Sequence, residues 1–364
     1  MGTALTAPPL GATYAQAGVD ISAGNSFAQM VKTLIAQAWP EAAAEIGGFA
    51  GGGIIPQAGG KFPSRVETST DGTGTKAILA ALVEKFDGIG YDAVAMSAVD
   101  TYVAGAQPTY LLDNLDVAKL QPAKHIAIVA SVIEACRLAG CKLVGGETAE
   151  LPDLFKHSWM FNLNTSVVGF SYPTNGEPFG PTAVKAGDLI YGWPSYGLGS
   201  NGFSLARKVF RLKDRPSRAR VRLERVWPEL GETLAEALLR PTPIYISAIE
   251  RQKSRGVKFL AHAHITGGGT VENIPRCLPA GCKVRLNRSQ WQRPPIFSLI
   301  QRLGGVETSE MDRTFNQGLM MVSVVDSSGP SINDPHALLV GEVVAREADE
   351  LQVELVGSYC DDNV

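Results

Sequence analysis

Apolar residues along this chain repeat with a helical spacing in some segments and a strand spacing in others, which limits the possible folds more than any other feature. Helical spacing is clear over 26–38, 76–86 and 122–140, and strand spacing over 65–70, 109–117, 141–145 and 164–172. Because the two patterns interleave, the sequence excludes an all-helical or all-strand architecture. The predicted fold class is therefore mixed α/β.

A proline- and glycine-rich segment, 173–188, separates this set of elements from a second one. Beyond it we expect helices at about 201–211, 230–239, 244–255 and 294–303, and strands at about 189–193, 257–264, 283–287 and 318–325. The length of 364 residues also suits two domains. We predict a first domain over 1–175 and a second over 176–364. The basic segment 213–225 is expected to be a solvated loop that runs into a short strand.

Composition narrows the functional classes. The net charge of -3 does not indicate a surface for nucleic acid. No apolar run approaches the roughly 18 residues of a membrane helix, and the N-terminus lacks the pattern of a secretion signal. We expect a cytoplasmic protein with a small-molecule substrate and with no nucleic-acid or membrane partner.

Four of the five cysteines form two pairs with the same C-x4-C spacing, Cys136 with Cys141 and Cys277 with Cys282. The odd total argues against a disulfide framework. A four-cysteine metal site is an alternative, but zinc sites usually have shorter spacings. Each pair is better explained as a helix end, a glycine cap and the start of a strand.

The loop 70-TDGTGTK-76 has the composition of a phosphate-binding loop but not a common spacing. Its glycines allow backbone N–H groups to approach an oxyanion, Asp71 offers a hard oxygen for Mg²⁺, and Lys76 offers a positive charge for a phosphate. The spacing fits neither the Walker A nor the Rossmann pattern. A plain tight turn is the alternative.

Three further segments point to the same chemistry. Asp100 is expected in mid-helix among small apolar residues, where an isolated carboxylate needs a cation or donors. Glu147 follows two glycines at the end of a strand, and 266-TGGGT-270 runs into a helix, where free N–H groups attract anions. A helix cap, an exposed turn and a flexible connection are the respective alternatives. Together these segments indicate phosphoryl chemistry on a magnesium-bound nucleotide.

These motifs, in this order, resemble the phosphoribosylformylglycinamidine cyclo-ligase (AIR synthase) family of purine biosynthesis. The resemblance covers roughly residues 14–325. It is carried by YAQAGVDISAGN, GGFAG, STDGTGTK, DAVAMSAVD, GGETAELP, SNGFSLARK, PTPIY, AHAHITGGGTVENIPR and MDRTFNQGL. The order is also similar to a wider ATP-using superfamily that includes selenide water dikinase, thiamine-phosphate kinase and the hydrogenase-maturation dehydratase.

The resemblance implies a fold of two α/β domains and a homodimer in which the first domains pair into a β-barrel. It implies that ATP, with Mg²⁺, phosphorylates the formyl (amide) oxygen of formylglycinamidine ribonucleotide. A nitrogen of the amidine side then attacks that carbon, and phosphate leaves as the imidazole ring closes. The products are aminoimidazole ribonucleotide, ADP and phosphate.

Carried over position by position, the resemblance also implies the site residues. The metal ligands are Asp71, Asp100 and Glu147. Catalytic roles fall to Asp71, Lys76, Asp100, Asn201 and His264. ATP contacts Asp71, Gly72, Thr73, Gly74, Thr75, Lys76, Gly145, Gly146, Glu147 and Thr148. The substrate contacts Ser200, Asn201, Thr266, Gly267, Gly268 and Gly269.

The chain departs from the family pattern at several positions. Val99 stands where the family usually has asparagine, Gly199 where it has histidine, and Ala15 where it has lysine. Lost hydrogen-bonding groups at a reacting face are expected to reduce the rate by orders of magnitude. Two alternatives therefore stay open: a divergent paralogue that phosphorylates an amide or acid oxygen of another small molecule, and a catalytically silent dimer that binds nucleotide.

Overall fold

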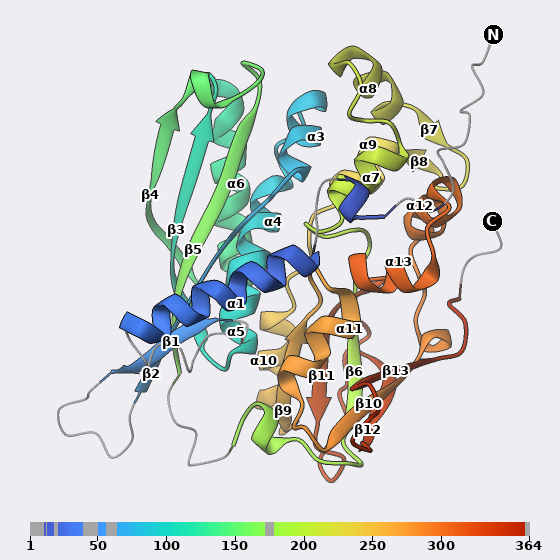
Figure 1. Ribbon diagram of the computed structural model, residues 1–364. Helices are drawn as coiled ribbons and strands as arrows, with labels where there is room; N and C mark the ends of the chain where they lie inside the picture. Colours follow the sequence, from blue (N-terminus) through green and yellow to red (C-terminus); the bar gives the residue numbers. More distant parts are fainter. Residues whose placement is uncertain are drawn as a thin grey trace.

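Two β-sheets, each with its own helices, organise the chain (Figure 1). The computed structural model describes residues 11, 13–17, 21–38, 50–55, 64–171 and 178–360. The predicted mixed α/β class with two domains is confirmed, although the predicted boundary at 175/176 lies outside the described residues. None of the helices in these ranges combines the length and apolar character that a membrane crossing requires.

The first sheet has five strands, and its order brings distant polar segments side by side. The order is β1 (Gly51–Ile55), β2 (Ser64–Gly72), β5 (Phe161–Ser171), β3 (Gln107–Val117) and β4 (Lys142–Glu150). All neighbours are antiparallel except β3 and β4, which are parallel. The strand expected at 141–145 therefore continues to Glu150, so Glu147 lies within a strand and not at its end.

Helices cover one face of this sheet. They are α3 (Lys76–Val83), α4 (Ile89–Val94), a π-helical turn (Ala95–Val99), α5 (Asp100–Val103) and α6 (Pro122–Ala139). As predicted, α6 begins at a proline in its first turn and is ended by Gly140, whose φ of 73° is left-handed. All five cysteines are free, which agrees with this interpretation of the Cys136–Cys141 spacing. Helix α1 (Ile21–Ala38) crosses in front of the two domains (Figure 1).

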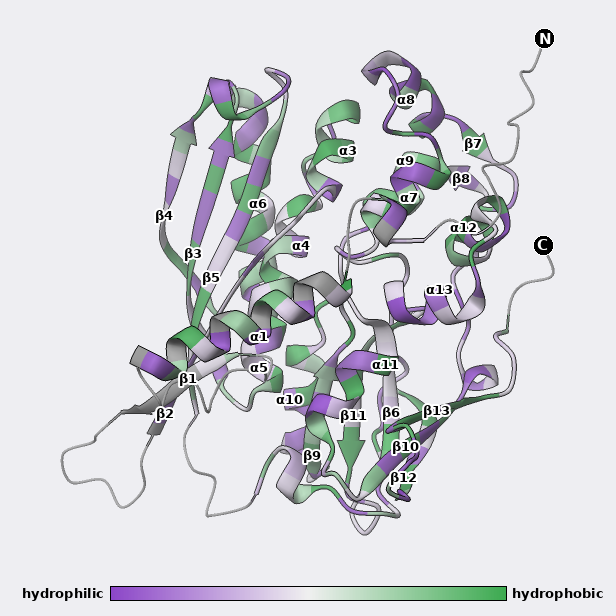
Figure 2. Cartoon of the chain, viewed as in Figure 1, coloured by the Kyte–Doolittle hydropathy of each residue, from purple (hydrophilic) through white to green (hydrophobic). Residues whose placement is uncertain are grey.

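The second sheet has six strands in the order β13 (Val353–Val356), β10 (Cys282–Asn287), β12 (Leu338–Ala345), β6 (Leu189–Pro194), β11 (Leu319–Val325) and β9 (Phe259–His264). Strand β11 lies between β6 and β9 and is buried at every position, so its residues are almost entirely hydrophobic (Figure 2). The side chain of His264, at the end of β9, faces the first domain through its contact with Asp100.

Helices surround the second sheet: α7 (Phe203–Val209), α9 (Leu234–Leu239), α10 (Ile246–Ser254), α11 (Gly269–Asn273), α12 (Pro295–Gly304) and α13 (Thr308–Thr314). The loop predicted within 213–225 is wrong, because residues Pro216–Leu223 form a helix, α8. Pro216 opens its first turn, and Ala219 and Leu223, four residues apart, bury one stripe. The short strand follows as β7 (Val226–Trp227), paired with β8 (Glu232–Thr233).

One apolar core runs through both domains. It contains Leu79 of α3 and Ile128 of α6 together with Leu205 of α7 and Phe297 of α12, all fully buried. Helix α3 also contacts α9, and α10 contacts α6. The two domains are therefore packed against each other, and the loops between them are held by this packing.

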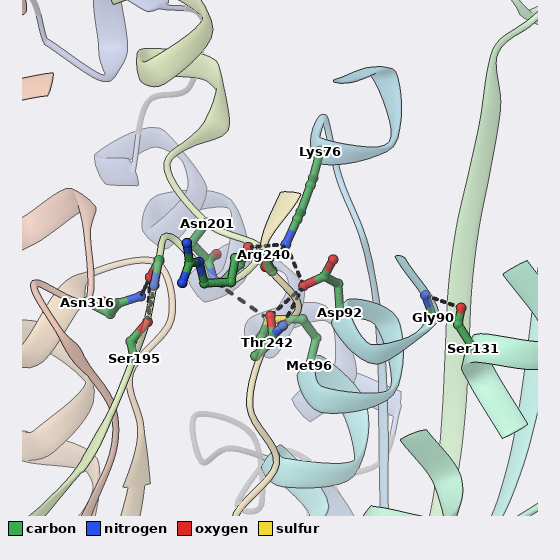
Figure 3. A network of polar contacts seen from close by, with 12 residues as sticks. Lys76, Gly90, Asp92, Met96, Ser131, Ser195, Asn201, Arg240, Thr242 and Asn316 are labelled. Carbon is green, nitrogen blue, oxygen red and sulfur yellow. Dashed lines mark hydrogen bonds and ion pairs between the residues drawn. The ribbon is translucent and has the colours of Figure 1, made fainter. Parts of the chain in front are cut away.

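Close packing of α4 on α6 generates a prediction about Gly90. Its N–H donates to Ser131 Oγ at 2.9 Å (Figure 3), and an added Cβ would lie 2.3 Å from the Val132 nitrogen. Gly90→Ala should therefore force the helices apart and reduce the free energy of unfolding by about 1–3 kcal/mol. Urea unfolding measures this. The control is Gly281→Ala, where nothing lies within 4 Å of the added carbon; equal midpoints for the two variants would contradict the packing argument.

Candidate functional site

Asp71 is the last residue but one of β2, and residues 73–75 form the turn that connects this strand to α3. Asp71 pairs across the sheet with Thr165, whose side chain is buried on the helix-covered face. Because residues directly opposite each other on neighbouring strands project to the same face of a sheet, Asp71 points to that face. Its Oδ1 accepts a 2.7 Å hydrogen bond from the N–H of Gly72, and Gly74, with φ 54°, makes the turn into α3.

Asp100 and His264 meet at the domain boundary. Asp100 follows the π-helical turn at once, a feature that often marks functional sites. Its Oδ1 lies 2.8 Å from Nδ1 of His264 at the end of β9, and the imidazole is fully buried. His264 Nε2 has no hydrogen-bond partner among the described residues. Asp100 therefore orients the imidazole, and Nε2, which is also buried, keeps an open hydrogen-bonding position.

Electrostatics place Asp71 beside this pair. Although its side chain reaches solvent, desolvation by the surrounding protein and the negative charge of Asp100 raise the pKa of Asp71 above its usual value. The Gly72 N–H and His264 act in the opposite direction but do not cancel the rise. Two carboxylates that repel each other at an open surface form an environment that favours a cation.

The predicted substrate residues lie next to one another. Asn201 lies against Gly267, since a Cβ added to Gly267 would be 3.5 Å from Asn201 Oδ1. Ser200 Oγ is buried and has no partner within the described ranges. An unpaired buried hydroxyl is costly unless a ligand or water completes it. Ser200 therefore has an open hydrogen-bonding position at this boundary.

The glycine run 267–269 is held by contacts with neighbouring residues. Asn273 donates through Nδ2 to the carbonyl oxygens of Gly269 at 2.8 Å and Gly267 at 3.1 Å. Gly268 and Gly269 have φ of 98° and 59°, and a Cβ on Gly269 would lie 1.9 Å from the Asp312 carbonyl oxygen. Only glycine fits there. The following helix, α11, has five residues, so the predicted helix-dipole site is smaller than expected.

Lys76 points into the protein and contacts groups of both domains. Its side chain is fully buried, and Nζ donates to Asp92 Oδ1 at 2.7 Å, to the Gly199 carbonyl at 3.1 Å and to the Arg240 carbonyl at 2.7 Å (Figure 3). An ammonium group has three donors, and these contacts use all of them. With these contacts made, Lys76 has no donor left for a phosphate, and its predicted phosphate contact stays a prediction.

Glu147 lies apart from Asp71 and Asp100 in this structure. Across the sheet Glu147 pairs with Asn114, which pairs with Asn164, which pairs with Gly72. Three strand spacings separate Glu147 from Gly72, about 14 Å. In the part of the chain that the structure describes, no three His, Cys, Asp or Glu side chains form a metal-binding group. The predicted three-carboxylate set is not assembled in one place.

Glu147 instead lines a pocket of about 440 Å³ over the first sheet. The other lining residues are Thr70, Leu112, Asp113, Asn114, Gly146, Asn164 and Ser166. Gly146 packs on Asp113, since an added Cβ would lie 1.8 Å from its Oδ1. Sequence reasoning missed the two asparagines. Their signal was the alternation of polar residues along 109–117 and 161–171, visible only once both segments are known to be neighbouring strands.

The remaining predicted residues occupy simpler positions. Thr73 is fully buried and its N–H donates to the Leu163 carbonyl at 3.0 Å, while Thr75 precedes α3. Gly145 and Thr148 lie in β4. Of the departures, Val99 is buried in the π-helical turn and Gly199 has φ 67°. Ala15 lies in a short 3-10 helix, Ala15–Ala17.

Two family models match the chain, one on each domain. Residues 63–170 match "AIR synthase related protein, N-terminal domain" and residues 185–354 match "AIR synthase related protein, C-terminal domain". The chain is 44% identical over 321 residues to the phosphoribosylformylglycinamidine cyclo-ligase of Desulfitobacterium hafniense, covering 87% of this chain and 90% of that protein. It is 42% identical over 356 residues to the enzyme of the same name from Citrifermentans bemidjiense, covering 94% and 98%.

Solved structures share the fold at low identity. AaThiL in complex with AMPPCP and TMP aligns with a TM-score of 0.57 at 16% identity, covering 90% of this chain and 93% of that one. The hydrogenase maturation protein HypE in complex with ATP aligns with a TM-score of 0.54 at 17% identity, covering 83% and 84%. At such identities the likeness concerns the fold alone. The two domain matches and the level of identity over nearly the whole length show that this chain belongs to the phosphoribosylformylglycinamidine cyclo-ligase (AIR synthase) family.

Proposed function

We propose that this protein uses ATP to close the imidazole ring of formylglycinamidine ribonucleotide, releasing aminoimidazole ribonucleotide, ADP and phosphate. The family supports the reaction, and the site supports its chemistry. The observation that carries the proposal is the convergence of Asp71, Asp100 and His264 from three separate segments.

Magnesium fits the carboxylates that the site provides. Mg²⁺ prefers oxygen ligands and is usually held by one or two carboxylates together with substrate phosphates. Asp71 and Asp100, which repel each other, match that pattern without a third protein ligand. When bound, the ion would neutralise charge on the transferred phosphoryl group. Glu147 lies on the open face of the first sheet with Asn114 and Asn164, so its contact with ATP stays a prediction.

The chain's own residues would mainly position the reactants. In the proposal, His264, held by Asp100 through Nδ1, offers Nε2 to the substrate, and Ser200 and Asn201 offer hydroxyl and amide groups. The backbone of 267–269 approaches closely because it has no side chains. An amide oxygen is a poor leaving group, and phosphorylation makes it a good one. Correct placement then supplies much of the rate.

Two alternative functions are to be separated from ring closure. Val99, Gly199 and Ala15 replace polar residues of the family pattern, which favours a paralogue that acts on another small molecule or a silent nucleotide-binding protein. A coupled assay on purified protein separates them. Phosphate release that requires formylglycinamidine ribonucleotide supports the main proposal, release that requires another substrate supports the paralogue, and ATP binding without turnover supports the silent protein.

A homodimer is part of the proposal, as is a cytoplasmic location. The open face of the first sheet exposes Tyr110 and Leu112, 46% and 49% exposed, and α1 exposes a stripe of Phe27, Met30 and Leu34. Exposed apolar side chains grouped in this way suit burial against a second copy. The pairing of first domains into a barrel follows from the family resemblance and would cover the strand face that carries Leu112.

For the reaction, we expect Asp71→Asn to reduce substrate-dependent phosphate release by about 10²-fold or more, because a neutral amide binds Mg²⁺ weakly and the affected charge is part of the transition state. The circular dichroism spectrum should not change, since Asp71 is exposed. Asp87→Asn, another exposed aspartate, serves as the control and should keep full activity. Normal turnover of Asp71→Asn at saturating Mg²⁺ would refute the assignment.

For the assembly, we expect Leu112→Lys to convert a dimer into a monomer, because it places a charge in a buried interface. Light scattering coupled to size-exclusion chromatography measures the mass. Leu351→Lys, at another exposed leucine outside the first sheet, is the control and should remain dimeric. A monomeric wild-type protein would contradict the dimer proposal directly.

A further inference from the structure

A fully buried ion pair joins the two domains beside the site. Lys76 Nζ and Asp92 Oδ1 are 2.7 Å apart, with side-chain exposures of 1% and 0%. The same Asp92 oxygen accepts hydrogen bonds from Thr242 N–H at 3.1 Å and Thr242 Oγ at 2.6 Å (Figure 3). Lys76 Nζ also donates to the carbonyl oxygens of Gly199 and Arg240, which belong to the second domain. Four chain segments thus meet at one ammonium and one carboxylate oxygen.

Three of these segments are continuous in sequence with residues of the proposed site. Lys76 is the first residue of α3 and directly follows the turn 73–75, which comes after Asp71 at the end of β2 and is called the Asp71 loop here. Asp92 lies in α4, in the same continuous helical segment as Asp100. Gly199 directly precedes Ser200 and Asn201. The buried pair therefore touches the loop, the helix and the substrate segment from which the site is built.

Energetics also favour a positioning role over a stabilising one. Burial removes both charges from water, and this desolvation cost offsets much of their electrostatic attraction. A buried ion pair is therefore weak evidence for stability. Its geometry, however, is demanding, because each donor of the ammonium must find an acceptor. Here the acceptors come from both domains, so the ammonium fixes their separation. With these contacts made, no donor of Lys76 is left for a direct phosphate contact.

We propose that the Lys76–Asp92 pair is a positioning device that sets the distance between the Asp71 loop and the Ser200–Asn201 segment. This inference deepens the proposed ring closure and rests on it for its effect on rate. It assigns Lys76 no contact with nucleotide or substrate. Lys76 acts instead through the carbonyls of Gly199 and Arg240, which it holds in place.

The test removes both charges together. Lys76→Met alone would leave the Asp92 carboxylate buried without a cation, so the variant to use is Lys76→Met with Asp92→Asn. The introduced amide would still accept from Thr242 through its oxygen. The matched control is Lys124→Met with Glu84→Gln, which removes an exposed ion pair of 2.6 Å in the same domain. Circular dichroism and thermal unfolding confirm that both variants fold.

Three readouts decide the matter. The Kd of ATP with Mg²⁺ should stay within about twofold of wild type. Hydrogen exchange in peptides spanning 197–204 and 239–244 should become at least tenfold faster, while the control variant changes neither. The kcat for formylglycinamidine ribonucleotide should fall about 10²-fold, the loss expected for a misplacement of about 1 Å.

Other outcomes overturn the inference. A weaker Kd for ATP with unchanged exchange at 197–204 would indicate that Lys76 binds phosphate after all. Unchanged exchange and unchanged kcat would show that the pair positions nothing. If wild-type protein lacks turnover, the proposed function fails, yet the exchange comparison still decides the positioning role. If the double variant does not fold, Thr242→Val, which removes one hydrogen bond to Asp92, should show the same faster exchange to a smaller degree, and unchanged exchange there overturns the inference.

Discussion

The buried ammonium of Lys76 is the contact on which the arrangement of the two domains near the site depends. It lies at the start of the helix that follows the glycine loop, and its acceptors come from one residue of the first domain and two of the second. Every donor has a partner, so the group is satisfied without water. Because the partners are a carboxylate and two main-chain carbonyls, the contact constrains backbone positions and not only side chains.

Repulsion between carboxylates is the second constraint. Asp71 and Asp100 approach closely enough that Asp100 contributes to the raised pKa of Asp71. The His264 imidazole, oriented by Asp100, partly offsets this charge but leaves Nε2 free of partners among the described residues. This group of side chains does not neutralise its own negative charge. It suits a site that is completed by a cation and a charged ligand when the reaction occurs.

The departures from the family pattern are well accommodated by the fold. Gly199 adopts φ 67°, and its carbonyl accepts from Lys76, while an added Cβ would lie 2.7 Å from Met320 Cε. Val99 is buried in the π-helical turn next to Asp100. The local backbone is thus built around the residues that this chain has.

The sequence by itself determined the two mixed α/β domains, most helices and strands, and the family, because these depend on local periodicity, glycine and proline positions and long ordered motifs. It also indicated Asp71, Asp100 and His264 as site residues by resemblance, although only the fold brought them together. The helix α8 was missed since four of its eight residues are polar or basic around a stripe of only two buried side chains.

Only the tertiary structure decided the direction in which Lys76 points and the place of Glu147. A lysine after a glycine loop is expected to face a phosphate, and its burial depends on acceptors 123 and 164 residues away in the chain. Glu147 was expected beside Asp71, but strand order placed β5 and β3 between them. Local sequence carries no record of strand order or of distant carbonyl groups, since both are set by how the domains pack.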